Sequence, residues 1–421
     1  MKIWLINHYG ANMFLDKGGR HYCMAKYLKK LGHEPIVICA NTLHNGSDPV
    51  IDTNENWHME TAEEIRVPFV FLKCRPYKGN GKDRVLNIID FYRGIKKCYK
   101  DISREYGKPD IVLGSSIHPL APVAAVKISK KLSAKCICEY RDLWPDELIS
   151  MGAMGENSMP ARILRRIEYW SYKRADALIF TMEGAAEYIK SRKWDKKSGG
   201  AVDLDKAIYI NNGVDLEEYN NNIEKYKIND DDLDNDDTFK VIYTGMIRRA
   251  NGIDKILEIA KKLKDHPQIK FLLYGSGNET DDIIKQIKDE RISNVIYKGS
   301  VNKQYIPYVL SKSDLNLLNY MNGDLFRYGC SNNKLFEYLA SGKPILCTIK
   351  MNYSILRKYN CGIEVDENCS IDEMADLIRN IYLDPGQASE YRKNTLTAVK
   401  NFDFAYLSQI LDKVMNGVVR K

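Results

Sequence analysis

A segment in the last third of the chain combines the residue types that bind anions. Residues 331–344 read Ser-Asn-Asn-Lys-Leu-Phe-Glu-Tyr-Leu-Ala-Ser-Gly-Lys-Pro. Three helix-capping residues, Ser331, Asn332 and Asn333, precede an amphipathic run that ends at Gly342. The free backbone N–H groups at the start of such a helix form a site for a diphosphate.

Two charged residues extend this predicted site. Lys334 lies in the first turn of the helix, where its ammonium adds positive charge. Glu337 lies one turn further along, where its carboxylate can accept hydrogen bonds from ribose hydroxyls. Every capped helix has an N-terminus of this kind, so the residues alone leave a purely structural role open.

A second set of candidates follows apolar runs in the N-terminal half. His118 comes shortly after residues 111–113, and Arg141 and Asp142 follow residues 135–138. Both positions follow predicted strands, where the open edge of an α/β sheet binds ligands, so Asp142 is a candidate ligand or base. A lone histidine is more often structural, and Arg141 also fits a core, cap or sugar-platform role.

The elements that must position these residues alternate between strands and helices. Helical spacing of apolar residues predicts helices at 21–31, 253–263, 281–288 and 406–418. The alternation predicts an α/β fold of parallel sheets wrapped by helices. Short apolar runs predict strands at residues 3–6, 36–40, 69–72, 111–113, 135–138, 177–180, 207–211, 239–243, 269–274, 295–297, 315–318 and 344–347.

The length of 421 residues predicts two domains. The polar segments 191–206 and 220–237 cannot build a core, so we expect a linker and a loop, with Asp230, Asp231 and Asp232 on a solvated surface. We place the domains at 1–200 and 201–403, with a helix over about 404–421 that can brace the first. Two doubly wound domains facing each other would form a cleft at the carboxyl ends of their strands, and the loop with Gly18 and Gly19 would face it.

Composition narrows the class of protein. The net charge of +7 suits phosphorylated ligands or an anionic membrane surface without demanding nucleic acid. Ten cysteines show neither zinc spacing nor a disulfide framework, so we expect buried thiols and no metal. The first apolar run is too short for a signal peptide or a membrane span, which predicts a cytoplasmic protein.

Several motifs resemble those of family 4 glycosyltransferases, which have the GT-B fold. Segment 331–344 is similar to the family's donor-binding helix, and residues 141–145, Arg-Asp-Leu-Trp-Pro, resemble a branch of bacterial O-antigen, capsule and fucosaminyltransferase-like enzymes. The other matches, in chain order, are Gly18-Gly19, residues 31–34, 210–215 (the "PNGVD" loop), 243–245 with Asn251-Gly252, 274–277, 298–301 and 313–315.

The resemblance implies a retaining, metal-independent transfer of a sugar from a nucleotide-sugar, most often a UDP-sugar. The implied transfer needs no cofactor, and its acceptor is a glycan or a polyprenyl-diphosphate-linked sugar. It assigns catalytic roles to His118, Asp142, Lys334 and Glu337. The resemblance assigns acceptor binding to His118, Arg141 and Asp142. Besides Lys334 and Glu337, the implied donor site comprises Gly18, Gly19, Gly245, Arg249, Gly275, Lys298, Gly299, Val301, Gly329, Cys330, Ser331, Asn332 and Asn333.

The chain departs from the family pattern at two places. Gly329 stands where family members carry a first glutamate, so backbone N–H groups of Gly329 and Cys330 are expected to approach the sugar. Asp324 is an alternative carboxylate. The usual Arg and Lys pair at the phosphates is out of register, and we favour Arg249 over Arg248 as the phosphate ligand.

Two alternatives and one partner stay open. A nucleotide-sugar epimerase of the same fold would also bind a UDP-sugar, and Gly329 would suit a non-catalytic binding subunit. Residues 85–99 and 159–175 mix basic and apolar side chains, which is typical both of helices on an anionic membrane and of helices flanking a sheet. We expect peripheral contact with the inner face of the cell membrane.

Overall fold

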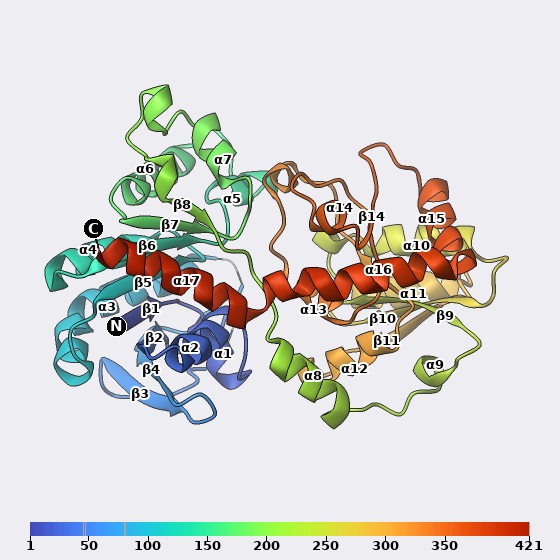
Figure 1. Cartoon of the computed structure of the whole chain (residues 1–421), viewed down its shortest axis with the longest axis horizontal. Coiled ribbons are helices and arrows are strands. Elements are labelled where there is room, and N and C mark those ends of the chain that lie inside the picture. The colour runs from blue at the N-terminus through green and yellow to red at the C-terminus, as the bar shows by residue number, and fades with distance from the viewer. Residues whose placement is uncertain (45, 47, 80, 421) are drawn as a thin grey trace. The chain divides into compact units, whose positions relative to one another are not determined.

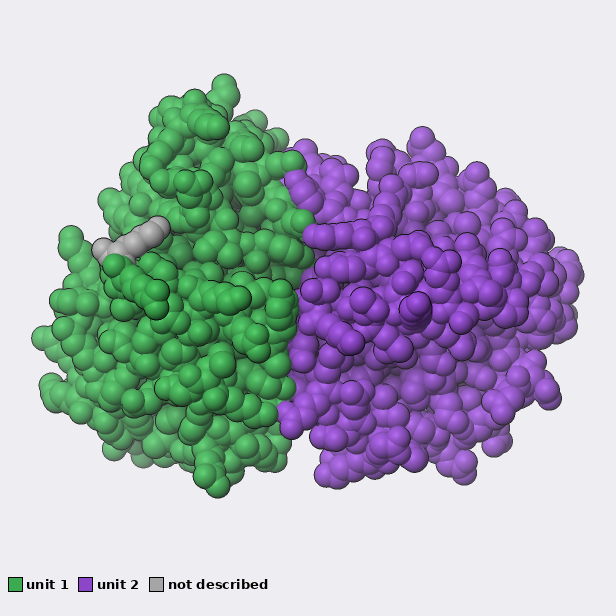
Figure 2. All heavy atoms as spheres, viewed as in Figure 1, with its two compact units in different colours: residues 1–211, 404–421 green, residues 212–403 purple. Residues whose placement is uncertain are grey.

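The computed structural model describes residues 1–44, 46, 48–79 and 81–420 (Figure 1). The chain folds into two compact units, residues 1–211 with 404–421 and residues 212–403 (Figure 2). Each unit is built around one sheet, with helices packed on both faces.

Within the described residues, the sheet of unit 1 has the strand order β3-β4-β2-β1-β5-β6-β7-β8. Its strands are parallel except β3, which pairs antiparallel with β4 at the edge. The central strands are buried along nearly their whole length, as expected for a sheet covered on both faces. The strands are β1 (Lys2–Ile6), β2 (Glu34–Ala40), β3 (Trp57–Ala62), β4 (Val67–Leu72), β5 (Ile111–Ser116), β6 (Lys135–Tyr140), β7 (Ala177–Phe180) and β8 (Ala207–Tyr209).

The last helix of the chain, α17 (Phe404–Val419), belongs to unit 1 (red in Figure 1). Leu407, Leu411 and Met415 are fully or almost fully buried and join the same core as α2. The other helices of the unit are α1 (Gly10–Leu15), α2 (Arg20–Lys30), α3 (Lys82–Tyr106), α4 (Leu120–Leu132), α5 (Asp146–Ser150), α6 (Met159–Tyr172) and α7 (Ala185–Ser191), with 3-10 turns η1 (Lys196–Ser198) and η2 (Leu204–Lys206).

The sheet of unit 2 is parallel throughout its described strands, in the order β11-β10-β9-β12-β13-β14. Those strands are β9 (Phe239–Thr244), β10 (Ile269–Tyr274), β11 (Val295–Gly299), β12 (Leu315–Leu318), β13 (Ile345–Cys347) and β14 (Gly362–Glu364). The helices are α8 (Leu216–Lys225), α9 (Asp231–Asp234), α10 (Ile253–Lys262), α11 (Thr280–Asp289), α12 (Ile306–Ser311), α13 (Asn333–Ala340), α14 (Ile355–Tyr359), α15 (Ile371–Leu383) and α16 (Pro385–Ala398), with 3-10 turns η3 (Arg249–Asn251), η4 (Lys303–Tyr305), η5 (Asp324–Tyr328) and η6 (Val399–Phe402).

The strand order explains where ligands are expected in each unit. In both sheets the order reverses next to the first strand of the unit, β1 or β9. Loops diverge at that point and leave the carboxyl ends of the strands accessible to a ligand. The polar residues that the sequence placed after these strands therefore fall at the binding edge of each sheet.

The predicted boundary at 200/201 is wrong by about ten residues, because the units divide between Asn211 and Asn212. Strand β8 pairs with β7, so the first sheet continues beyond the polar segment 191–206. Segment 220–237 was predicted as a loop, but it contains most of α8 and all of α9. Side-chain caps from Asp215 and Asp230 start these helices, which polar composition alone obscured.

Among the described residues, no helix combines the length and the apolar character that crossing a membrane requires.

Candidate functional site

The loops after β9 and β10 lie against each other at the carboxyl edge of unit 2. The Gly245 N–H donates to Tyr274 O at 3.0 Å, and the Gly275 N–H donates to Gly299 O at 2.8 Å. Both Gly245 and Gly275 have φ of +141°. A Cβ at Gly275 would lie 1.8 Å from Gly245 O, so a side chain at this position cannot fit without moving the backbone.

Helix α13 begins beside these loops. The Tyr338 hydroxyl accepts a hydrogen bond from the Thr244 N–H at 2.9 Å, which ties α13 to the end of β9. The Asn212 side chain donates to Ser331 O at 3.4 Å and also to the Asn333 side chain. The predicted side-chain cap of α13 is not formed. The N-cap residue Asn332 makes no side-chain hydrogen bond to the first turn and donates instead to Cys330 Sγ.

Lys334 is enclosed by aromatic rings at the start of α13. Its Nζ lies 4.5 Å from the ring centroid of Tyr243 and 4.6 Å from that of Tyr320. It donates to the Tyr243 hydroxyl at 3.1 Å, and that hydroxyl donates to Met246 O at 2.9 Å. No carboxylate of the described residues forms an ion pair with Lys334.

The pKa of Lys334 is lowered to about 7, chiefly by burial and also by the nearby charge of Arg248, while Cys330 and Glu337 act in the opposite direction. A cationic group kept from water without a carboxylate partner is costly. An anionic ligand would supply the missing charge, so the geometry describes an anion site.

Glu337 lies one turn along α13 and is half-buried. Burial raises its pKa, although the charges of Lys303 and Lys334 oppose the shift. None of the described residues donates a hydrogen bond to its carboxylate, which therefore retains its capacity to accept one from a ligand hydroxyl.

The segment before α13 has a conformation that favours glycine. Gly329 ends η5 with φ of +105° and is buried together with Cys330. Asp324, the alternative carboxylate, is exposed at the start of η5. The chain therefore presents backbone, and no carboxylate, at position 329.

One predicted donor-site lysine already has protein partners, and the two candidate arginines differ in their relation to Lys334. Lys298 forms ion pairs with Asp230 at 2.7 Å and Asp232 at 2.8 Å, so its charge is already satisfied. The acidic run that the sequence placed on a solvated surface thus holds β11. Of the two arginines, Arg248 acts electrostatically on Lys334, whereas no described contact joins Arg249 to Lys334.

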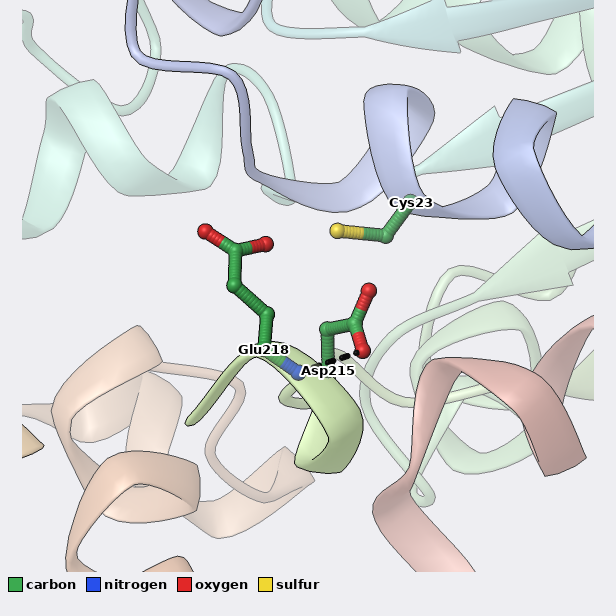
Figure 3. A group of neighbouring side chains, drawn as sticks. All are labelled: Cys23, Asp215 and Glu218. Carbon is green, nitrogen blue, oxygen red and sulfur yellow. Dashed lines mark hydrogen bonds between the residues drawn. The ribbon is translucent and has the colours of Figure 1, made fainter. Parts of the chain in front are cut away.

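The "PNGVD"-like loop has a structural role within unit 2. Asp215 is the N-cap of α8 and accepts a hydrogen bond from the Glu218 N–H at 3.2 Å (Figure 3). Val214 pairs with Asp403 in an isolated bridge. Together with the Asn212 contacts described above, this loop fixes the backbone that leads into α13.

At the carboxyl edge of unit 1, His118 is buried and fully hydrogen-bonded. Its Nδ1 accepts from the Leu120 N–H at 3.2 Å, so its Nε2 carries the proton and donates to His8 Nδ1 at 2.7 Å. Burial lowers the pKa of His118 to about 3, with the charge of Arg84 acting in the same direction. The prediction of a catalytic, acceptor-contacting His118 needs correction, because both ring nitrogens are used inside the core.

Unit 1 also contains a buried polar network that was not predicted from the sequence. Glu139, on β6, pairs with Arg20 at 2.6 Å and with His21 at 3.0 Å. Arg20 also donates to Ile210 O at 3.0 Å and Asn211 O at 2.6 Å. Burial alone would raise the pKa of Glu139, but the charges of Arg20 and His21 outweigh it and lower the pKa well below its usual range. A glutamate inside the apolar run 136–140 was the available signal, since a charge in a buried strand requires a partner.

Arg141 and Asp142 follow β6 and stay half-buried. Burial raises the pKa of Asp142, partly offset by Arg141. The Arg141 Nη1 is buried without a hydrogen-bond partner among the described residues. Gly19, with φ of +89°, is the N-cap of α2, and Gly18 precedes it. These residues form the accessible polar part of the unit 1 edge.

The chain matches two protein-family models and two curated glycosyltransferases. A model described as "Glycosyltransferase Family 4" matches residues 22–218, and one described as "Glycosyl transferases group 1" matches residues 224–397. The probable glycosyltransferase WbjE of Pseudomonas aeruginosa is 22% identical over 328 residues, which cover 72% of this chain and 78% of WbjE. The putative colanic acid biosynthesis glycosyl transferase WcaI of Escherichia coli (strain K12) is 20% identical over 306 residues, 70% of each chain.

Among solved structures, Anabaena HepE in complex with UDP is 15% identical, with a TM-score of 0.67 over 99% of this chain and 100% of that one. That likeness shows the fold, two parallel-sheet α/β units of the GT-B class. The two sequence models match successive halves of the chain, and their order agrees with the two units. The chain therefore belongs to the family 4 glycosyltransferases.

Proposed function

We propose that this glycosyltransferase transfers a sugar from a UDP-sugar, with retention of configuration, to a glycan or lipid-linked acceptor in bacterial surface-polysaccharide synthesis. The observation that carries the proposal is Lys334. Its ammonium lies at the N-terminus of α13, between two aromatic rings, with no carboxylate partner in the described chain. A nucleoside diphosphate supplies the negative charge that this position lacks.

The donor half of the reaction follows from the same residues. In our proposal the diphosphate accepts hydrogen bonds from the α13 N-terminus and charge from Lys334 and Arg248, while Glu337 accepts from ribose hydroxyls. As the sugar–phosphate bond breaks, negative charge grows on the leaving oxygen, and these groups stabilise it without requiring a metal. HepE, which shares the fold, has been solved with UDP and with UDP-glucose.

Retention follows from attack on the face that the diphosphate leaves. The departing phosphate oxygen can take the proton of the acceptor hydroxyl, so the reaction needs no separate base carboxylate. Asp142, whose pKa is raised by burial, and Arg141 are then ligands for the acceptor. The relatives WbjE and WcaI are described as glycosyltransferases, the latter of colanic acid biosynthesis, which supports a polysaccharide acceptor.

The donor site is tested by isothermal titration calorimetry with UDP. Lys334→Met and Glu337→Gln should each weaken UDP binding by at least about tenfold, since a charge-assisted hydrogen bond contributes about 1.5–3 kcal/mol. Lys262→Met, on the exposed side of α10, is the matched control and should bind like the wild type. Wild-type protein that binds no UDP would overturn the donor site.

A second measurement separates transfer from epimerisation. The enzyme is incubated with UDP-N-acetylglucosamine alone, and products are followed by NMR. We expect slow hydrolysis at most, because transfer needs an acceptor. Rapid appearance of an epimerised free sugar without acceptor would replace the transferase proposal by the epimerase.

We also propose that unit 1 contacts an anionic membrane through α4 and α6. Lys127 lies over the rings of Tyr92 and Trp170 at 5.4 and 5.9 Å, and Arg174 lies 4.5 Å over Trp170. These contacts join α3, α4 and the end of α6 into one basic and aromatic surface. Helix α4 has no acidic residue, and the one acidic residue of α6, Glu168, is buried.

The exposed side of α6 adds apolar groups, because Met159 is 65% and Ile163 47% exposed. Basic residues beside exposed apolar side chains suit anionic headgroups, each contributing about 1 kcal/mol near a membrane surface. Vesicles of phosphatidylcholine with phosphatidylglycerol should therefore sediment the protein at low salt, and vesicles of phosphatidylcholine alone should not.

A quadruple variant tests this surface. Changing Lys127, Lys131, Arg166 and Arg174 to Gln should abolish sedimentation with the anionic vesicles. The control changes four exposed lysines of unit 2, Lys262, Lys264, Lys285 and Lys288, to Gln and removes the same net charge. Equal loss in both variants would show that only net charge matters and would overturn the α4–α6 surface.

A further inference from the structure

A buried chain of hydroxyl and carboxyl groups links α5, α6 and α7 in unit 1. Glu168 is 2% exposed, and its Oε1 accepts from the Tyr172 hydroxyl at 2.7 Å. Its Oε2 lies 2.9 Å from the Tyr188 hydroxyl. The same Tyr188 hydroxyl lies 2.8 Å from Asp146 Oδ2. Three helices thus meet through two carboxyl groups and one shared phenol.

The number of protons shared by these hydroxyl and carboxyl groups shows how they are ionised. The Tyr188 hydroxyl has one proton, yet it stands at hydrogen-bond distance from two carboxyl oxygens. If both carboxyl groups were ionised, one of these contacts would bring two acceptors together without a proton. One of the two carboxyl groups must therefore carry a proton.

The surrounding charges decide which group is protonated. Arg165 donates to Asp146 Oδ1 at 3.0 Å, and Arg192 donates to the same oxygen. The two guanidinium groups both donate to Asp146, and their positive charge matches a carboxylate there. No ion pair joins Glu168 to a described basic residue, so the proton belongs on Glu168 Oε2 and is donated to the Tyr188 oxygen, whose own proton goes to Asp146.

Asp146 is the first residue of α5 and directly follows residues 141–145. Two backbone bonds close this turn, from the Glu147 N–H to Leu143 O at 2.9 Å and from the Ile149 N–H to Pro145 O at 3.1 Å. The position of Asp146 therefore sets the path of the chain that carries Arg141 and Asp142.

We propose that Glu168 is a positioning residue that acts as a neutral carboxylic acid, holding Asp146 through Tyr188 and thereby the acceptor-side segment 141–145. The link to the acceptor rests on the proposed function; the protonation of Glu168 does not. Burial raises the pKa of Glu168 to about 8, Asp146 raises it too, and Tyr172, Tyr188 and Arg192 act in the opposite direction. The remaining facing groups are Tyr140 from β6 and Arg165 from α6.

Two substitutions of Glu168 should have different effects. Glu168→Gln places an amide N–H₂ where the acid proton lies and a carbonyl where Tyr172 donates, so it reproduces the neutral form at every pH. Glu168→Ala removes both bonds and leaves the Tyr172 and Tyr188 hydroxyls without a carboxyl partner on α6. The Gln variant should match the wild type near pH 7 in fold and thermal midpoint, and the Ala variant should not.

Infrared spectroscopy of the whole protein tests the protonation without any activity. The wild type at pH 7 should show the carbonyl stretch of a protonated carboxyl group in the difference spectrum against Glu168→Gln, and that band should vanish as pH rises through about 8. A wild-type spectrum with no such band at pH 7 would overturn the proposal whatever the enzyme's substrates are.

The positioning role is tested by the pH dependence of the acceptor KM, measured with saturating donor. Above pH 8 an ionised Glu168 would repel Asp146, so the wild-type KM should rise by up to about tenfold per pH unit, the limit for one ionisation. Glu168→Gln should lack that rise. Identical pH profiles in the two proteins would restrict Glu168 to a structural role and overturn the positioning role.

Discussion

Two lysines at the carboxyl edge of unit 2 show how the surroundings of a residue decide its role. Lys298 is paired with Asp230 and Asp232, whereas Lys334 has aromatic rings as its neighbours. The family resemblance placed both lysines in the donor site. A lysine whose charge is satisfied by protein gains little from a ligand, so Lys334 is the residue whose titration should report on the donor.

At the residue scale we predict that UDP binding takes up a proton above pH 7. The pKa of Lys334 is lowered to about 7, so the free protein loses this charge as pH rises, and the diphosphate restores it. The affinity should fall by up to about tenfold per pH unit between pH 7 and 9. Calorimetry in buffers of different ionisation enthalpy measures the proton uptake directly.

The variant Lys334→Arg is the control for this prediction, because a guanidinium keeps its charge over the whole range. It should bind UDP with little pH dependence. The stability of the unliganded protein should change with pH in the opposite direction to the UDP affinity. A lysine whose pKa is lowered by folding makes the free energy of unfolding rise with pH between about 7 and 10. Proton release on binding would contradict the assignment.

At the scale of the elements, the stacked loops after β9 and β10 depend on glycine. We predict that Gly275→Ala destabilises unit 2 by about 3 kcal/mol or more, because the new Cβ would overlap Gly245 O at a position with φ of +141°. Gly299→Ala is the matched control, since Gly299 has φ of +75° but no atom within 4 Å of the added Cβ. It should lose only about 1–2 kcal/mol. Urea unfolding measures both, and equal losses would refute the packing argument.

At the scale of the whole molecule, each unit has its own core, and α17 belongs to the first. We predict two calorimetric unfolding transitions, of which UDP raises only that of unit 2. At one hundred times the Kd the stabilisation should be about 2.7 kcal/mol. Deletion of residues 404–421 takes Leu407, Leu411 and Met415 out of the core of unit 1, so it should lower or abolish the other transition and leave UDP binding intact. A UDP shift of both transitions would contradict independent units.

Local patterns in the sequence determined the class of this protein. The alternating apolar runs predicted every strand of the two sheets except β3 and β14, and most bounds were within three residues. The polar run 331–333, Gly342 and the charges of Lys334 and Glu337 marked α13, because these features depend on neighbours along the chain. The family resemblance used the same short segments.

Contacts between distant residues decided what those segments do. Only the tertiary structure paired Lys298 with acids nearly seventy positions earlier, used both nitrogens of His118 in the core and set Tyr243 and Tyr320 around Lys334. It also returned α17 to the first unit and extended the first sheet to β8. Burial and charge compensation depend on what packs around a side chain, and the residue type alone does not contain that information.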